Sequence, residues 1–403
     1  MKKYLTKHLI GGIVSLLVFL TFIFFMAQIL MPYNFSINYI LGVTPQELAQ
    51  IQQELGLDLP IWKQYFNWIS RIVQGNLGTS FFGGSVSDML LKMVPPTLLV
   101  FGLGSITAFF LGKWLGKVAA WNRESWLSKV ATFSAVSLYS IFPPWFAVLI
   151  SSFLSVPLYT LAKVAISTPS SFLRDGYLNA AIWGSPRTPE GFASYTPPAT
   201  IMTYMLLSVI IIAIGLMVIT WGMKIILRKK IPVIINISIL TVCWILSWFV
   251  FGFAQKAFDI MFFAIKPLIV FTLLSFGDTM MIMKTSMQDT LNEDYLLTAR
   301  AKGLSDKILR DKHASRNAIL PAISRFIINM PYLFTGVVII ETATGWNGLG
   351  GAVFGAFYSM DIPVMMGGFV VVGLISLVAQ LGLEALQAYL DRRILDKIYL
   401  QEI

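Results

Sequence analysis

The sequence predicts an all-α polytopic membrane protein with about eight transmembrane helices. Of its 403 residues, 56% are hydrophobic and only 12% are charged, and the mean hydropathy is +0.74. A soluble protein of this length cannot bury so much apolar surface, so lipid must be its solvent. Eight stretches are long and apolar enough to cross the hydrocarbon, which takes about 20 residues. They are about 9–31, 96–118, 130–155, 201–223, 232–254, 262–283, 320–341 and 364–388.

The first of these stretches follows the basic residues Lys2, Lys3 and Lys7, as the apolar core of a cleaved signal peptide also would. Its apolar run is too long for a signal peptide, and no small-residue cleavage site of the A-x-A kind follows it. We therefore expect residues 1–31 to form an N-terminal tail and an uncleaved first span.

The distribution of basic residues predicts the orientation of the spans. The net charge is +10, and cytoplasmic segments of membrane proteins are enriched in Lys and Arg. If the N-terminus lies inside and the spans alternate, the inside segments hold most of the 30 Lys and Arg residues. The acidic residues show no such bias. Both termini are therefore expected in the cytoplasm, and the positive charge needs no nucleic-acid partner.

Two of the expected outside segments are long. Residues 32–95 contain Thr44-Pro45-Gln46-Glu47, which has the form of a helix capping box with proline at the first helical position. The aromatic-rich stretch 60–72 is expected to be a helix, either lying along the outer membrane surface or packed in an ectodomain. The other segment, 156–200, is rich in Ser, Pro and Gly near its end and is expected to be a loop with at most one short helix.

Several classes of function lack the residues that they need. Cys243 is the only cysteine, and His8 and His313 lack metal-ligand spacing, so we expect no disulfide and no metal site. No G-x-x-x-x-G-K-[ST] loop occurs, and we expect neither ATP nor another cofactor in this chain. The spans hold no constellation such as H-E-x-x-H or paired aspartates, which argues against an enzyme. An ion-coupled secondary transporter, which should show an internal repeat, is a less favoured alternative.

A charged, helix-capable elbow at 287–318 interrupts the apolar pattern between the sixth and seventh spans. Its first part, 287–302, is expected to be one helix, which Gly303 can end in a left-handed conformation. Ser305 can cap the helix that follows. The residues near one face of the first helix are Leu291, Tyr295, Leu296, Ala299 and Lys302. The pattern predicts a bent element on the inside surface, which is either a solvated basic hairpin or a surface grasped by a soluble partner.

This elbow resembles the cytoplasmic coupling signature of ATP-binding-cassette (ABC) importer permeases. The general signature is E-A-A-x-x-x-G followed by I-x-L-P. This sequence departs from it, because Leu297 and Thr298 stand where the signature has Glu and Ala. The variant of the oligopeptide/dipeptide class, D-Y-x-x-T-A-R-A-K-G-L, is matched more closely. The matching residues are Asp294, Tyr295, Thr298, Ala299, Arg300, Ala301, Lys302, Gly303 and Leu304.

Other motifs of the same class follow in the right order. Residues 54–80 are similar to E-L-G-L-D-x-P … Q-Y … W … G-x-L-G-x-S, and 341–350 are similar to V-V-E-T-x-x-x-W-P-G-L-G. The resemblance covers 1–155 and 262–397. The rest has no counterpart in the common six-span form. We therefore expect core spans two and three in 96–155, an outside insertion at 156–200, an extra transmembrane hairpin at 201–254, and the remaining core at 262–397.

The resemblance implies a permease subunit that forms half of a translocation pathway for peptides. It also implies a second, homologous permease, two cytosolic ATPase subunits that bind ATP and Mg²⁺, and an extracytoplasmic peptide-binding protein. The location implied is the bacterial or archaeal inner membrane. Residues 294–304 would contact an ATPase subunit. Importers of oligosaccharides or nickel belong to the same class, so another small solute is an alternative cargo.

Two acidic residues near the membrane are candidates for lining the pathway. Asp278 lies a few residues before Lys284 and could instead form an interhelical pair with a basic residue at a span end. Glu341 ends the seventh span on the outer side. It could belong to an outer gate or simply be solvated.

Overall fold

The computed structural model describes residues 2–30, 59–167, 197–226 and 233–390. Within these ranges the chain is helical apart from its connections and a single β-bridge between Thr79 and Ser85. The predicted all-α class is confirmed. The capping box at 44–47, most of the insertion at 156–200 and the C-terminal end of the core region lie outside the described residues.

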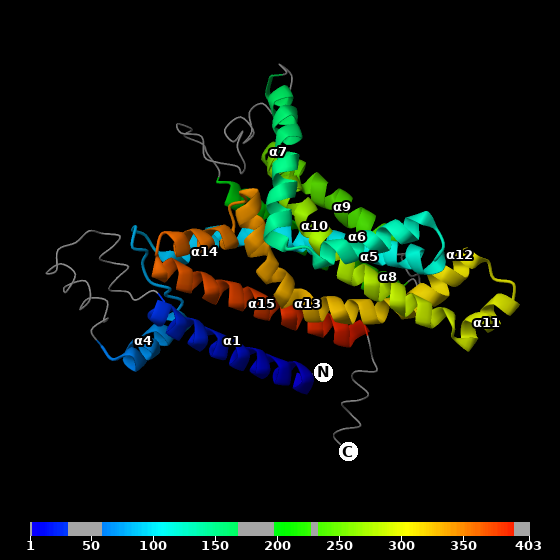
Figure 1. Ribbon diagram of the computed structural model, residues 1–403, viewed down its shortest axis with the longest axis horizontal. Coiled ribbons are helices and arrows are strands. Elements are labelled where there is room, and N and C mark those ends of the chain that lie inside the picture. Colours follow the sequence, from blue (N-terminus) through cyan, green and yellow to red (C-terminus); the bar gives the residue numbers. More distant parts are fainter. Residues whose placement is uncertain (1, 31–58, 168–196, 227–232, 391–403) are drawn as a thin grey trace.

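Six of the described helices are long and apolar enough to cross a membrane, and most of them run along the long axis of the molecule (Figure 1). They are α1 (Lys2–Leu30), α5 (Val86–Trp121), α7 (Pro143–Ser167), α8 (Pro198–Ile226), α10 (Ala254–Leu291) and α15 (Ile362–Leu390). The predicted span 232–254 is the shorter apolar helix α9 (Val233–Val250), and 320–341 lies within α13 (Ser315–Thr344).

The predicted third span, 130–155, is wrong as a single helix. The chain forms α6 (Trp126–Ser140), breaks at Ile141–Phe142 and continues as α7. The break has a local cause, because Pro143 restricts the residue before it and cannot donate a backbone hydrogen bond. Ile141, two residues before Pro143, ends α6 in an extended conformation, with ψ of 147°. In Figure 1, α6 and α7 run in clearly different directions, and α7 extends to Ser167, inside the segment expected to be a loop.

Helices α5 and α10 form the central pair of the bundle, and glycines let them approach closely. A Cβ placed on Gly112 would lie 2.6 Å from the carbonyl oxygen of Phe276, and one on Gly116 would lie 2.6 Å from that of Met280. Small residues four apart are a common device for bringing two membrane helices together. At 36 and 38 residues, each helix is over 50 Å long at about 1.5 Å per residue. Both therefore extend beyond a hydrocarbon layer of about 30 Å.

The predicted helix at 60–72 is confirmed as α4 (Ile61–Val73). One face packs against α1, where the hydroxyls of Thr21 and Tyr65 lie 2.7 Å apart and Trp68 is buried beside Phe24. The opposite face bares Trp62 and other large apolar side chains. The contacts with α1 fit the interpretation of a packed helix, whereas a position along the outer membrane surface stays a prediction.

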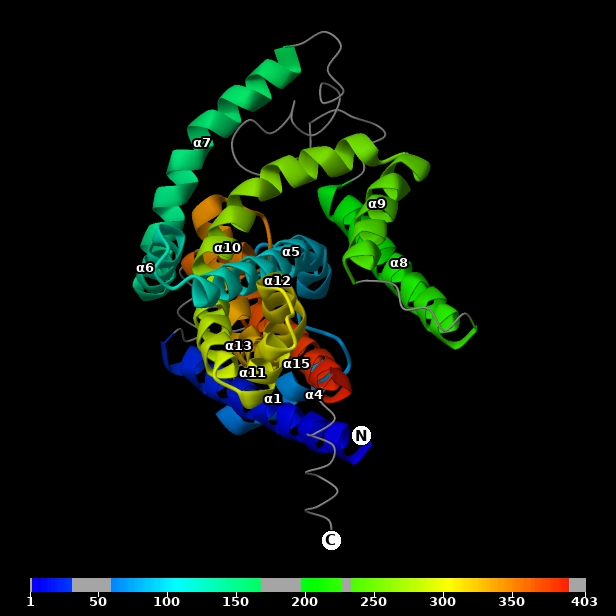
Figure 2. The ribbon, with the colours of Figure 1, turned by 90° about the vertical axis from the view of Figure 1, so that its right-hand side faces the viewer.

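The expected extra hairpin is present as α8 and α9, and Figure 2 shows this pair diverging from the main bundle. The two helices are joined by a hydrogen bond of 2.8 Å from Trp244 Nε1 to the carbonyl oxygen of Met205. Met205 and Trp248 are buried with Ile260 of α10 in one apolar cluster. The hairpin is therefore attached to the start of α10 and to α5.

The long axis has two distinct ends (Figure 1). At one, called here the elbow end, the short helices α11 (Asp294–Ala301) and α12 (Asp306–Ile308) lie between α10 and α13. The other, the far end, carries α4 and the short helix α14 (Leu349–Tyr358). The sequence did not predict α14, which follows the glycine-rich turn at 345–348.

Candidate functional site: the elbow between α10 and α13

The elbow begins with a break that the sequence did not predict. The single helix expected at 287–302 is in fact the end of α10 and the separate helix α11. The amide of Asn292 donates to the carbonyls of Asp289 and Thr290, which closes α10 with a tight turn. Glu293 then takes an extended backbone conformation, with ψ of 138°, and α11 starts in a new direction. Asn favours such turns because its side chain competes with helical hydrogen bonding.

The predicted left-handed Gly303 is confirmed, with φ of +76°. Its amide donates to the carbonyl of Arg300, and the amide of Leu304 donates to that of Ala299. This pair of bonds is the Schellman motif, which ends a helix by satisfying its last carbonyls. Ser305 occupies the cap position of α12 as expected, but among the described residues its hydroxyl finds no capping amide. The elbow is thus bent by backbone conformation at Gly303.

One side of the elbow is packed against the bundle. Leu296, Leu309 and Ala314 are buried in a cluster with Met283 and Met287 of α10. Of the face predicted for the first helix, Leu291, Leu296 and Ala299 belong to this cluster, whereas Tyr295 and Lys302 are exposed. The packed surface thus includes three of the five predicted residues. The break at Asn292–Glu293 separates Leu291 from the other four, so the predicted face does not run continuously from α10 into α11.

The other side of the elbow is polar and exposed. Asp294, Thr298, Arg300, Ala301 and Lys302 all lie on it, together with the apolar side chain of Leu297. The Thr298 hydroxyl donates to the carbonyl of Asp294 within α11. Tyr295 accepts a hydrogen bond of 2.9 Å from Asn317 Nδ2, which ties α11 to the start of α13. The elbow is therefore packed on one side and leaves a polar side of α11 exposed.

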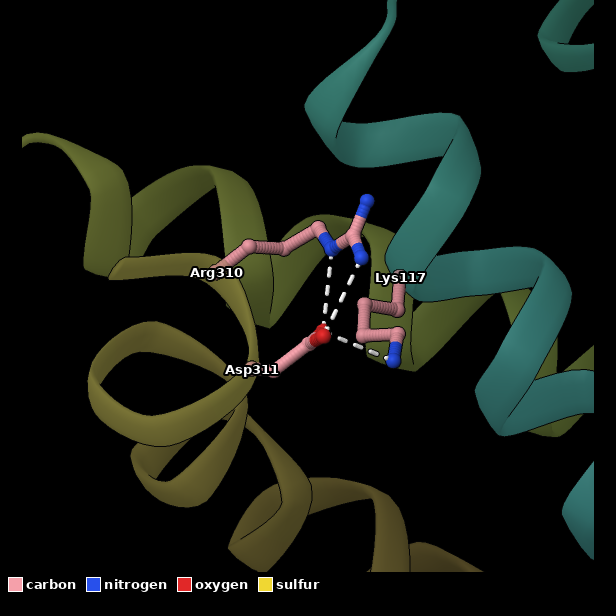
Figure 3. A network of polar contacts seen from close by, with 3 residues as sticks. All are labelled: Lys117, Arg310 and Asp311. Atoms are coloured by element: carbon pink, nitrogen blue, oxygen red, sulfur yellow. Dashed lines mark hydrogen bonds and ion pairs between the residues drawn. The ribbon is translucent and has the colours of Figure 1, made fainter. Parts of the chain in front are cut away.

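The return limb of the elbow contains a π-helical turn, η2 (Leu309–Ala314). A π-turn holds an extra residue within a helix and is often found at functional sites. Here it presents Asp311 to two cations, as Figure 3 shows. Arg310 Nε lies 2.9 Å from Asp311 Oδ1 and Arg310 Nη2 lies 3.1 Å from Oδ2, while Lys117 Nζ of α5 lies 2.9 Å from Oδ1.

These cations lower the pKa of the Asp311 carboxyl from 3.8 to about 2, first through the hydrogen bond from Arg310 and then through Lys117. The same contact raises the pKa of the Arg310 guanidinium. Lys117, Arg310 and Asp311 were not predicted as site residues. The only sequence signal is that Asp311 is an acid within a basic stretch, between Arg310 and Lys312.

An open groove of about 590 Å³ lies beside the elbow. It is lined by the turn between α5 and α6 and by Leu291 at the end of α10. The turn contributes Arg123 and Glu124, so the groove has charged walls near the end of α10.

The two acidic residues predicted near the membrane lie far from the elbow's exposed side and from each other. Asp278 Oδ2 accepts a hydrogen bond of 2.6 Å from Asn329 Nδ2 and lies 3.8 Å from Arg325 Nε. The interhelical pair proposed as its alternative role is therefore present, between α10 and α13. A role in the pathway stays a prediction.

Glu341 is completely buried, so the expectation that it is solvated is wrong. Oε1 accepts a hydrogen bond of 2.6 Å from the Thr97 hydroxyl of α5, and Oε2 accepts one of 2.6 Å from the amide of Gly350. The glycine-rich turn after α13 packs tightly over this carboxyl group. A Cβ placed on Gly348 would lie only 2.2 Å from Oε1, so a larger residue does not fit there. Glu341 thus joins α13, α14 and α5 at the far end.

The fold is that of a multi-pass helical membrane protein with a charged helical elbow at one end. Family comparison makes this specific. Residues 199–396 match the family described as the binding-protein-dependent transport system inner membrane component, and residues 1–87 match its N-terminal component. The chain therefore belongs to this family and is a multi-pass protein of the inner membrane. The first match includes α8 and α9, although no family counterpart was expected for them.

Relatives extend over nearly the whole chain. A putative peptide permease of Brucella suis biovar 1 (strain 1330) is 26% identical, over 98% of this chain and 99% of that protein. The dipeptide transport system permease DppB of Escherichia coli (strain K12) is 25% identical, over 88% and 87%. The oligopeptide transport system permease AppB of Bacillus subtilis (strain 168) is 24% identical, over 87% and 86%.

Proposed function

We propose that this chain is the permease subunit of an ABC importer and forms half of a translocation pathway for peptides. Family membership supports the transport role, and the names of the relatives in Brucella, Escherichia and Bacillus support peptides as the cargo. The observation that carries the mechanism is the two-sided elbow, which is packed against α10 on one side and polar on the other.

In this mechanism the exposed side of α11, with Leu304 and Gly303 at its end, docks in a cytosolic ATPase subunit. The buried side, led by Leu296 and Leu309, makes the elbow move with the ends of α10 and α13. Closure of two ATPase subunits would then displace α11 as a rigid body and change the packing of the long helices. Residues 294–304 carry this contact.

The proposal assigns an orientation and a set of partners. The elbow end, where Lys and Arg are concentrated, faces the cytoplasm, as does the start of α1. The far end faces outward and receives a peptide-loaded binding protein. A second permease completes the pathway. ATP and Mg²⁺ bind in the ATPase subunits, so hydrolysis takes place outside this chain.

The test is reconstitution of the complex that co-purifies with the tagged chain. In proteoliposomes, uptake of labelled dialanine and pentaalanine should require ATP and should rise when the binding protein is added. ATP-driven uptake of maltotriose or Ni²⁺ in place of the peptides would overturn the cargo but keep the permease. Uptake by the lone chain, driven by an ion gradient without ATP, would overturn the importer itself and favour a secondary transporter.

A further inference from the structure

Helix α5 is tied at two levels to the continuous segment formed by η2 and α13. Near the elbow, Lys117 Nζ lies 2.9 Å from Asp311 Oδ1. Near the far end, the Thr97 hydroxyl donates to Glu341 Oε1 at 2.6 Å. The two anchor residues on α5 are separated by about 30 Å at 1.5 Å per residue. Helices α5 and α13 run in opposite directions (Figure 1). The two segments are therefore held together by side-chain contacts both near the elbow end and near the far end.

The elbow-side anchor is built from oriented charges. Arg310 contacts both carboxylate oxygens of Asp311 and holds the group in one orientation, with Oδ1 available to Lys117 (Figure 3). The Lys117 side chain is only 21% exposed. An ion pair with fixed geometry and partial burial is stronger than the typical pair on a protein surface, where two long side chains must be ordered in water.

The far-side anchor is buried and leads directly to the turn after α13. Thr97 Oγ1 also accepts a hydrogen bond of 2.8 Å from the amide of Leu349, and Trp346 Nε1 donates to the carbonyl of Pro96 at 3.1 Å. A shift of α5 along its axis must therefore move residues 345–350, which are the turn after α13 and the first two residues of α14, or break these bonds. The turn joins α13 to α14 on the outward-facing end.

The covalent route from the elbow to this turn is not a regular α-helix throughout. It passes through η2, whose i→i+5 hydrogen bonding differs from that of the α-helix that follows. A displacement of α11 could be absorbed there before it reaches the rest of α13. The contact between Asp311 in η2 and Lys117 in α5 offers a second route that does not follow the chain through α13. Helix α5 is α-helical from Val86 to Trp121.

We propose that Asp311 and Lys117 are positioning residues that make α5 move with the elbow. A displacement of α11 then reaches residues 345–350 through α5. The inference rests on the proposed function and deepens it. Energetic coupling between distant sites needs evidence of coupling rather than a chain of contacts alone. The decisive quantity is therefore the number of peptides transported per ATP hydrolysed.

The experiment compares variants in the reconstituted complex, with pentaalanine as the labelled cargo. Asp311→Asn and Lys117→Met should still hydrolyse ATP at the wild-type rate, but peptide uptake per ATP should fall by about tenfold, as expected for contacting residues that act together. Lys117→Arg keeps the charge and should keep the ratio. The double variant with Lys117→Met and Asp311→Asn should lose no more than either single variant, because two residues that act through one contact are not additive.

A second ion pair at the same end provides the matched control. Lys129 Nζ lies 3.6 Å from Glu124 Oε2, and both side chains are largely exposed. Lys129→Met should therefore leave uptake per ATP unchanged. If Asp311→Asn does not co-purify with the ATPase, Lys117→Met decides, because it keeps the contact between Arg310 and Asp311.

The outcomes separate the two proposals. If the wild-type complex shows no ATP-dependent uptake, the proposed function fails. If the wild type transports and both single variants keep its ratio of uptake to hydrolysis, the function stands and the role of Asp311 and Lys117 is overturned. Losses in the two single variants that multiply in the double variant would also overturn it, because the two residues would then act independently of their mutual contact.

Discussion

Thr97 and Glu341 are 244 positions apart in the chain, and the hydroxyl of Thr97 donates a buried hydrogen bond of 2.6 Å to Oε1 of Glu341. The same hydroxyl accepts from the amide of Leu349. Thr97→Val keeps the shape of the side chain but removes both bonds. It leaves a buried acceptor and a buried donor unsatisfied, which should destabilise the protein by about 1–3 kcal/mol.

The measurement is the midpoint of thermal unfolding of the detergent-solubilised chain, which should fall clearly in Thr97→Val. Thr285→Val is the matched control, because Thr285 is exposed. Among the described residues, its hydroxyl donates only to the carbonyl of Met281 in the same helix. Equal midpoints for the two variants would show that the far-end anchor does not stabilise the fold.

The close crossing of α5 and α10 makes a prediction about Gly112. A Cβ there would lie 2.6 Å from the backbone oxygen of Phe276, which cannot move aside as a flexible side chain could. Gly112→Leu should therefore separate the helices and cost about 1–3 kcal/mol or more. Gly102→Leu on the same helix is the control, because no atom lies within 4 Å of the corresponding Cβ. Thermal unfolding and the yield of monodisperse protein should distinguish the two variants.

The lowered pKa of Asp311 predicts how its contribution to stability depends on pH. Its pKa falls from 3.8 to about 2 in the folded protein, chiefly because Arg310 hydrogen-bonds to the carboxylate. A group whose pKa is lowered by folding stabilises the folded state above its unfolded pKa and loses that effect as the pH falls through its folded pKa. The stabilisation should thus be complete at neutral pH and disappear between pH 3.8 and about 2.

Thermal unfolding of wild type and Asp311→Asn at a series of pH values tests this. The difference between their midpoints should be constant above the unfolded pKa and shrink below it. Glu124→Gln provides the comparison, because its side chain is 95% exposed and should alter the midpoint little at any pH. A difference that persists undiminished at the acid limit would mean that Asp311 does not act through its charge.

The features that the sequence predicted correctly are those with a local cause. Apolar runs of sufficient length predicted five of the long helices in their places, since the need to satisfy the backbone in lipid leaves few alternatives to a helix. Gly303 was predicted to take positive φ because the helix must end there and glycine does so without strain. The motif residues from Asp294 to Leu304 were likewise predicted to form a helix that ends at Gly303, and they form α11 and the turn that follows it.

Some of the features that were missed depend on tertiary contacts. Others have a local signal, such as a proline, that lies within a long apolar run and was therefore overlooked. Pro143 marks the break between α6 and α7, but the apolar residues on both sides continue without interruption. Helix α14 is too short to be recognised as a span. The contact between Lys117 and Asp311 joins residues far apart in the chain, and neither has a neighbour that indicates its partner. For Glu341 a solvated position was one of two alternatives, and the sequence could not exclude it because the burial of Glu341 depends on α5 and α14 together.

The left-handed conformation of Gly303 provides the sharpest test of the elbow as a coupling element. Its φ is +76°, and no atom lies within 4 Å of a Cβ placed on it, so a substitution acts through backbone conformation alone. Gly303→Val should cost about 1–3 kcal/mol of local strain and change the angle between α11 and α12. Asn enters this conformation more readily, so Gly303→Asn should retain function.

In the reconstituted complex we expect both variants to insert into the membrane and to co-purify with the ATPase. Gly303→Val should hydrolyse ATP without matching uptake of labelled peptide, whereas Gly303→Asn should keep the wild-type ratio. Transport by the valine variant at the wild-type ratio would mean that the bend at Gly303 is not needed for coupling. An equal loss in both variants would instead mean that the partner contacts the glycine itself, because the backbone conformation alone cannot distinguish wild type from the asparagine variant.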